Sequence, residues 1–493
     1  MWLEFKRLPL VISLLGLLVL SMLVPAVHGL IFGEAYQGRT FLYAVLLELF
    51  VLIFIWLAVK TNKKSAKRHA DLWSLLVFFI VFPMALAVPF QEVLVTGRIV
   101  DAYLDLVSVI TTTGLKVFPD SSLTGTLIIW RVCLGWLCGF LMWVFAWSIF
   151  SPLSLGGFEL LEKKDHKKAN VQNEFVNRGS LPSEKFWNET VRLAPIYISI
   201  TIVFAVVLLI STRDPSFAAL RAMSTIATFG IYLPGDGARG FAAELTLFII
   251  MMFALSRATF SVSFFRKKYF ELFFDREFRL GLAIVVCSTV VISIFIFEGE
   301  FELLKVARLA WGAFFTSISF LTTTGLVSEF LPSEFRTFIE ANLILSALAM
   351  FGGGVATTAG GIKLLRIYIL GKHCRLEVHH LLSPAQVING QNDRKLNYYH
   401  NAMLVCIFFM VFVLSFVLVT LGLALTGSTI NEAVTLTLAT ITNTGPIVEQ
   451  ININSESIVD FDFLAKIILV ASMVLGRLEV LALLALLNPD IYR

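Results

Sequence analysis

Long apolar runs, separated by short polar segments, make up most of the chain. A helix needs about 20 apolar residues to cross a bilayer, and most of these runs approach that length. The runs that we expect to span are residues 8–24, 40–59, 72–88, 128–150, 193–210, 242–265, 280–297, 335–350, 404–423 and 463–487. The pattern predicts an all-α polytopic membrane protein with about ten spanning helices.

Four shorter helical segments lie between pairs of these spans. They cover residues 101–110, 215–226, 303–321 and 429–441, and each leads into a loop that contains a glycine. Non-helical backbone is tolerated at membrane depth only where protein buries it or water lines it. We therefore expect four units, each with the order span, short helix, loop and span, around one pore.

This order divides the chain into five parts. They are residues 1–69 with two extra N-terminal transmembrane helices, 70–185 with pore unit 1 and a cytoplasmic loop, 186–275 with pore unit 2, 276–394 with pore unit 3, a broken helix and a cytoplasmic loop, and 395–493 with pore unit 4. The first run could be a signal peptide, but a short loop joins it to the second run, which favours a retained helix. Clusters of Lys and Arg at 60–68, 162–168 and 266–268 predict a cytoplasmic N-terminus and C-terminus.

The loops that follow the short helices repeat one motif. Thr-Thr-Thr-Gly-Leu at 111–115 recurs at 322–326, and weaker copies read Ala-Thr-Phe-Gly-Ile at 227–231 and Thr-Asn-Thr-Gly-Pro at 442–446. Their glycines stand about 95 to 120 residues apart, a period that suits a duplicated membrane unit. A single copy would carry little weight, whereas four copies in register between spans argue against unrelated turns.

Four oxygen-rich turns around one axis could replace the hydration shell of a cation. Glycine lets the backbone adopt positive φ, and threonine hydroxyls add oxygens. The candidate filter residues are Thr111, Thr112, Gly114, Ala227, Thr228, Gly230, Thr322, Thr323, Gly325, Thr442, Asn443 and Gly445. Each short helix would also direct its partly negative C-terminal end at the filter, which favours a cation there.

The predicted span 335–350 is broken by a glycine-rich stretch that ends at residue 361. Each glycine in a helix interior costs about 1 kcal/mol relative to alanine, so this stretch predicts a loop within the membrane that could act as a gate. Arg477, near the middle of the last span, is costly there and therefore a candidate for function. The alternative is a structural pair with an acid on another helix, since Glu479, two residues further on, lies on another face. The candidate gate residues are Gly352, Gly353, Gly354, Thr357, Thr358, Gly360, Gly361 and Arg477.

Composition agrees with the apolar pattern. Of 493 residues, 57% are hydrophobic and 15% are charged, and the mean hydropathy is +0.83. This excludes a soluble protein and makes the lipid bilayer the main partner, while the small net charge of +4 gives no reason to expect nucleic acid. No cluster of His, Asp or Ser suggests an enzyme, and no cofactor is expected.

Several of these stretches together resemble one family. They are the two Thr-Thr-Thr-Gly loops, 442–446, Thr-Ala-Gly-Gly-Ile-Lys at 358–363 and Leu-Gly-Arg-Leu-Glu at 475–479. Over nearly its whole length the chain resembles the Trk/Ktr/HKT superfamily of potassium transporters, most closely the bacterial TrkH-type subunits. The resemblance implies a potassium filter at the four glycines, an intramembrane gate at 352–361 and a pore arginine at Arg477. It further implies a bacterial cytoplasmic (inner) membrane, a homodimer with one pore per subunit, and a cytosolic ring of TrkA/KtrA-type nucleotide-binding subunits.

We therefore expect passive potassium uptake, with potassium as the substrate ion bound only at the filter residues. The alternative mechanism is a symporter that couples potassium to sodium or protons, which needs a second ion site. Two other classes stay open: a membrane-embedded enzyme, which would leave the fourfold repeat unexplained, and a scaffold, which would tolerate substitution of the filter glycines.

Overall fold

The computed structural model describes ten stretches of the chain. They are residues 10–60, 70–94, 98–119, 122–151, 182–231, 240–256, 275–297, 302–382, 392–451 and 456–478. Glu479, the charged clusters at 162–168 and 266–268, most of the cluster at 60–68, and the end of the last predicted span lie outside these residues. The described residues contain helices, turns and loops and no strand, in agreement with the predicted all-α fold.

The N-terminal part is a helical hairpin. The helices α2 (Leu10–Ser21) and α3 (Leu23–Ile31) together form one apolar span, and α4 (Ala35–Lys60) returns beside them. The first predicted span, 8–24, was therefore too short. Its break at Met22 lies just before Pro25, which is tolerated in the first turn of α3 but would remove a hydrogen bond from a continuous helix.

The four units follow in the predicted order. Unit 1 contains α5 (Ala70–Ile80), α6 (Phe82–Leu94), α7 (Ile99–Ile110), α8 (Gly125–Phe145) and the π-helix η2 (Ala146–Phe150). Unit 2 contains α12 (Pro182–Thr212), α13 (Pro215–Ile226), α14 (Phe241–Met252) and the 3₁₀ turn η4 (Phe253–Leu255).

Units 3 and 4 are longer. Unit 3 contains α16 (Arg276–Ile296), α17 (Leu303–Leu321), the 3₁₀ turn η6 (Ser333–Thr337), α18 (Ile339–Phe351) and α19 (Leu364–Leu382). Unit 4 contains α20 (Asn392–Leu425), α21 (Ile430–Ile441), α22 (Ile447–Gln450), α23 (Glu456–Asp460) and α24 (Phe463–Leu478). The boundaries of the short helices α13 and α17 match the prediction, and α7 and α21 match within two residues.

Some predicted spans differ from the structure. Eight described segments are long and apolar enough to cross a membrane, and they include Leu303–Leu321, which was expected to be a re-entrant short helix. The return segments Phe241–Leu255 and Ile339–Phe351 are shorter apolar helices, and the latter begins after residue 335, the predicted start. Pro332 and the 3₁₀ turn that follows it delay that start.

The units close into a ring. The helix α8 packs against α12 and α13, α14 packs against α17, α19 packs against α20, and α24 packs back against α7 of unit 1. The helices at the centre, such as α7 and α21, bury most of their side chains, whereas α4 and α20 expose many large apolar residues. An exposed apolar surface of this kind suits contact with lipid.

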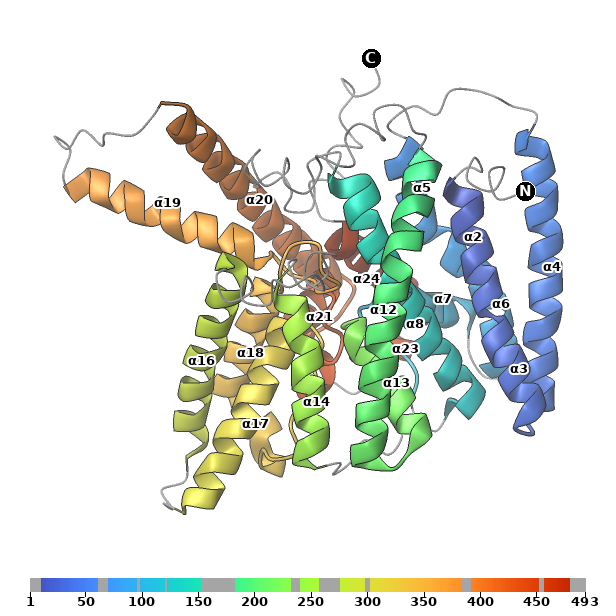
Figure 1. Cartoon of the computed structure of the whole chain (residues 1–493), viewed down its shortest axis with the longest axis horizontal. Coiled ribbons are helices and arrows are strands. Elements are labelled where there is room, and N and C mark those ends of the chain that lie inside the picture. The colour runs from blue at the N-terminus through green and yellow to red at the C-terminus, as the bar shows by residue number, and fades with distance from the viewer. Residues whose placement is uncertain are drawn as a thin grey trace.

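Two helices depart from this packed body. In Figure 1, α19 and α20 extend away from it at the upper left. The helix α19 begins where the glycine-rich loop ends. We call α19 and α20 together the projecting arm. The helix α19 therefore connects the glycine-rich loop at the centre of the ring directly to this arm.

Candidate functional site

The four short helices end in the same way. Their C-caps are the first residues of the four repeated loops, Thr111, Ala227, Thr322 and Thr442. The next residue has left-handed backbone in every copy: Thr112 (φ 52°), Thr228 (φ 49°), Thr323 (φ 57°) and Asn443 (φ 53°). Left-handed backbone is rare for a β-branched residue and costs on the order of 1–3 kcal/mol, so its recurrence at one register marks a built feature.

Backbone hydrogen bonds close each of these turns as a Schellman motif. In each copy, the residue just before the glycine donates its N–H to the carbonyl five residues earlier. The bonds are Thr113–Ser108 (2.8 Å), Phe229–Ser224 (2.9 Å), Thr324–Ser319 (2.9 Å) and Thr444–Ala439 (2.8 Å). The position that normally holds glycine in this motif holds threonine or asparagine here.

The four glycines of the repeated loops differ from the prediction in backbone conformation at two positions. Positive φ was expected at all four, but only Gly114 (φ 73°) and Gly325 (φ 75°) have it. Neighbouring loops leave no room for a Cβ at Gly230, Gly325 and Gly445, whereas a Cβ on Gly114 would meet its nearest atoms at 3.5 Å. A Cβ on Gly230 would lie 1.6 Å from the Thr324 oxygen, and a Cβ on Gly445 would lie 2.3 Å from the Leu115 nitrogen.

These contacts join the four loops into a closed set. Gly114 faces Gly230, Gly230 faces Thr324, Gly325 faces Pro446, and Gly445 faces Gly114. The Gly445 N–H also donates to the Thr113 carbonyl at 2.7 Å. The structure therefore brings all twelve candidate filter residues together, and they are buried. Backbone and hydroxyl oxygens from four loops at one buried place suit a partly dehydrated cation.

The glycine-rich loop lies against these turns. The Gly360 N–H donates to Thr323 Oγ1 at 2.8 Å, and a Cβ on Gly360 would lie 2.0 Å from the Thr442 carbonyl oxygen. The ends of the loop are joined to each other, since Ile362 and Lys363 donate to the Met350 and Phe351 carbonyls. The loop therefore leaves the end of α18, contacts the candidate filter, and returns to the start of α19.

Arg477 contacts this loop from α24. Its Nη1 donates to the Thr358 carbonyl at 2.6 Å, and its side chain is 5% exposed. Its Nε and Nη2 have no hydrogen-bond partner, and it forms no ion pair with a carboxylate, among the described residues.

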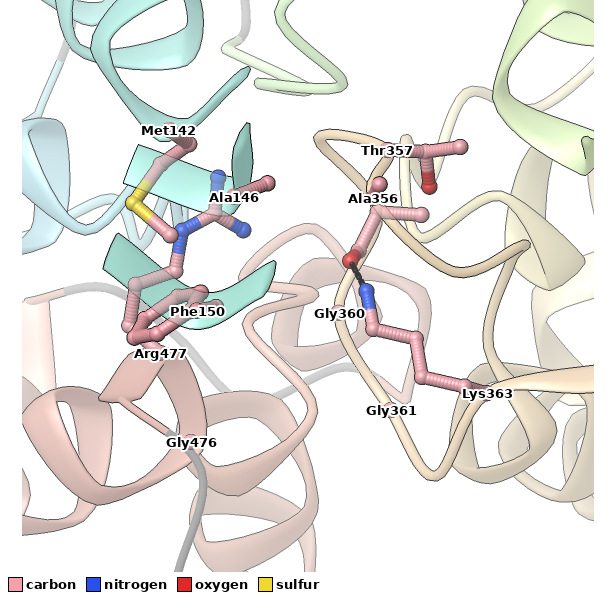
Figure 2. Close-up of a pocket in the computed structure, with 11 residues that line it drawn as sticks. Met142, Ala146, Phe150, Ala356, Thr357, Gly360, Gly361, Lys363, Gly476 and Arg477 are labelled. Atoms are coloured by element: carbon pink, nitrogen blue, oxygen red, sulfur yellow. Dashed lines mark hydrogen bonds between the residues drawn. The ribbon is translucent and has the colours of Figure 1, made fainter. Parts of the chain in front are cut away.

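A small cavity of about 30 Å³ separates Arg477 from part of the loop. Figure 2 shows Arg477 on one side, and Thr357, Ala356 and Lys363 on the other. The π-helix η2 contributes Ala146 and Phe150 to the wall. Such a volume holds a water molecule or two, because one water needs roughly 10–15 Å³ by this measure. Four of the eight candidate gate residues, Thr357, Gly360, Gly361 and Arg477, thus line one small space.

Buried ion pairs connect α7 to α24 and to α8, and these residues were not among the predicted site residues. Asp101 on α7 pairs with Lys466 on α24 at 2.5 Å, and Asp105 on α7 pairs with Arg131 on α8 at 2.7 Å. All four side chains are at most 4% exposed. Charged residues inside apolar segments could have revealed them, since such groups inside a membrane protein usually face a partner.

A further carboxylate organises the third loop. Glu244 on α14 accepts hydrogen bonds from Ser328 Oγ, Glu329 N and Trp311 Nε1, each at 2.8 Å. These donors lie on α17 and on the chain just after Gly325. Glu244 therefore fixes the segment that leaves the third loop against the neighbouring unit.

Comparisons with known proteins agree with this picture. The family model for TrkH, described as a cation transport protein, matches residues 59–489. The chain is 26% identical over 499 residues to the Trk system potassium uptake protein TrkH of Vibrio parahaemolyticus, covering 97% of each chain. It is 25% identical over 501 residues to the protein of that name from Escherichia coli K12, covering 97% of this chain and 98% of the relative.

A solved structure has the same fold. The crystal structure of the potassium transporter TrkH from Vibrio parahaemolyticus superposes with a TM-score of 0.76 at 24% identity, over 99% of this chain and 100% of that one. That structure therefore shares the helical fold described above. With a family model matching most of its length, this multi-pass membrane protein belongs to the TrkH family of cation transport proteins.

Proposed function

We propose that this protein takes up potassium ions across the cytoplasmic membrane of a bacterium, through a selectivity filter formed by the four loops. The supporting observation is the meeting of four turns of identical backbone register at Gly114, Gly230, Gly325 and Gly445. Relatives named as potassium uptake proteins give the identity of the ion. Filter oxygens would take the place of lost hydration water.

The glycine-rich loop and Arg477 would form the gate below this filter. The loop lies directly against Thr323 and Thr442, so an ion that leaves the filter meets it next. Arg477 would add a fixed positive charge to that path and raise the barrier for a cation. Transport would then require the loop to move away from the filter.

The assembly that we propose is based on the names of the relatives and on the family resemblance of the sequence. The relatives are described as components of a Trk system, which suits a translocating subunit that works with others. We propose a homodimer with one pore per subunit and a cytosolic nucleotide-binding ring as the regulatory partner. We propose that both termini lie in the cytoplasm, as the Lys and Arg clusters predict.

The test is cation uptake by proteoliposomes that contain the purified protein. Wild type should accumulate potassium and rubidium in preference to sodium, and Gly114→Ser should lose this preference. Gly427→Ser is the matched control, because Gly427 also has positive φ (97°) but has open space around it. If Gly114→Ser kept the wild-type preference, Gly114 would not belong to the filter.

The same vesicles distinguish uptake down the gradient from symport. Under a clamped membrane potential, passive uptake should reverse at the potassium equilibrium potential whatever the sodium or proton gradient. A reversal potential that moved with either of those gradients would establish the symporter alternative.

A further inference from the structure

Lys363 is a buried cation that the gate described so far does not use. It lies just before α19, has positive φ (83°), and its side chain is 8% exposed. Its backbone N–H donates to the Phe351 carbonyl at 3.0 Å, and its ammonium donates to the Ala359 carbonyl. A non-glycine residue in this conformation is held there by its surroundings.

Lys363 and Arg477 donate hydrogen bonds to adjacent carbonyls of the glycine-rich loop. The ammonium of Lys363 binds the Ala359 carbonyl, and the guanidinium of Arg477 binds the Thr358 carbonyl. Figure 2 shows the two side chains on opposite sides of the small cavity. They come from different units, Lys363 from the chain before α19 and Arg477 from α24.

Among the described residues, the lining of the cavity between them includes these two cations and no Asp or Glu. Two positive charges in a buried space repel a third, and the effect is larger than in water because the surroundings screen less. A cation entering this space would therefore meet both charges.

Movement of α19 would control the position of Lys363, because the two are adjacent in the chain. It directly precedes α19, which continues to Leu382 and projects from the body (Figure 1). An ammonium on a long flexible stem can change partners more readily than a planar guanidinium. A shift of α19 would thus alter the position of Lys363 without a change in α24.

We propose that Lys363 is a second cation of the gate, which closes the pore together with Arg477 and is withdrawn when α19 moves. This inference rests on the proposed function, since it requires that the loop at 352–361 controls the cation path. It assigns a separate task to each cation. Arg477 is the fixed charge, and Lys363 is the one connected to the projecting arm.

The test measures rubidium flux into proteoliposomes with the full-length protein and no added partner. Lys363→Gln should raise the flux on the order of tenfold, since removal of one positive charge from the path lowers the electrostatic barrier for a cation. Lys363→Arg should stay near wild type because it keeps the charge. Lys372→Gln, at an exposed position further along α19, is the matched control and should also stay near wild type.

Selectivity separates a gate residue from a merely structural one. The ratio of rubidium to sodium flux should not change in Lys363→Gln, because the filter loops stay intact. If that variant does not fold, Lys363→Met, which keeps an apolar stem, replaces it. A general loosening of the structure would lower the ratio and would overturn the proposal.

Two further variants distinguish failure of this inference from failure of the proposed function. If Arg477→Gln raised the flux and Lys363→Gln did not, the role of Lys363 would be wrong and the proposed gate would stand. If Gly114→Ser kept wild-type selectivity, the filter itself would be wrong. A chain that carries both Lys363→Gln and Arg477→Gln should have a higher flux than either single variant.

Discussion

The first and second loops adopt the same backbone turn with different supports. In the first loop, the hydroxyls of Thr111 and Thr113 bond to each other at 2.7 Å, and Ser108 Oγ accepts the Leu115 N–H at 2.7 Å. The third loop repeats this arrangement, with Thr322 bonded to Thr324 at 3.1 Å and Ser319 Oγ accepting the Leu326 N–H at 2.5 Å. These two loops are held by their own side chains.

The second loop lacks the two threonine hydroxyls and packs against its neighbour. Ala227 and Phe229 occupy the positions of the two threonines, while the Ser224 hydroxyl still donates to the Phe229 carbonyl. The Phe229 ring packs on Gly135 of α8, and Ala227 packs on Gly139 one turn along. The comparison teaches that packing between units can take the place of a local hydrogen bond in specifying one turn.

The largest effect is expected at Gly230. Gly230→Ala should abolish rubidium flux, because its Cβ would lie 1.6 Å from the Thr324 oxygen. Gly114→Ala should keep part of the flux, since its nearest contact is 3.5 Å and its main penalty is positive φ, on the order of 1–3 kcal/mol. Flux per folded protein, with folding judged by size exclusion, checks this order. Equal flux in the two variants would contradict it.

A smaller but more specific effect is expected at Gly135. Gly135→Ala would place a methyl group 2.6 Å from the Phe229 ring, and overpacking of this kind costs about 1–3 kcal/mol. Selectivity for rubidium over sodium should fall, and Phe229→Leu in the same chain should restore part of it. Absence of any coupling between the two substitutions in a double-mutant cycle would show that the ring does not transmit the change.

A modest effect is expected from removing one hydroxyl in the third loop. Thr324→Val keeps the shape of the side chain and removes the bond to Thr322, worth about 0.5–1.5 kcal/mol. The melting temperature in detergent should fall slightly, together with selectivity. Thr212→Val, whose hydroxyl bonds the Leu208 carbonyl outside the loops, should lower only the melting temperature. A loss of selectivity in the control would point to a general cause.

The smallest effect is expected at an ion pair between the first and fourth loops. Lys116 lies 3.6 Å from Glu449, and both side chains are partly exposed. Such pairs contribute about 0–1 kcal/mol and are screened by salt. Lys116→Ala should therefore change rubidium flux only at low ionic strength. An effect that persisted in high salt would mean that Lys116 acts otherwise than through its charge.

The sequence was sufficient for the order of elements and for the short helices. Apolar length identified the spans, and the repeated loops located the ends of α7, α13, α17 and α21. It was insufficient at Met22, where a break just before Pro25 interrupts a continuous apolar run, and at residue 335, where a 3₁₀ turn delays the start of the helix. Local propensity cannot show which of two competing hydrogen-bond patterns the surrounding helices will favour.

The candidate site was predicted in membership but not in conformation. Glycine seemed the natural carrier of positive φ, yet the structure assigns left-handed backbone to Thr112 and its counterparts. The reason is that the Schellman closure fixes that position first, and the glycines are needed for contact between loops. Lys363 was not among the predicted gate residues, yet it is buried and donates to the Ala359 carbonyl. Both outcomes depend on how each loop folds back on itself, and a linear pattern does not contain that information.

The two ion pairs on α7 imply an order for biogenesis. Asp105 meets Arg131 only 26 residues later in the chain, so this pair can form while the first unit is being inserted. The partner of Asp101 is 365 residues away, on the last helix. An unpaired carboxylate is costly in the bilayer. Asp101 therefore lacks its partner until synthesis is nearly complete, and a chain truncated before Lys466 would lack the ion pair that joins the first unit to the last.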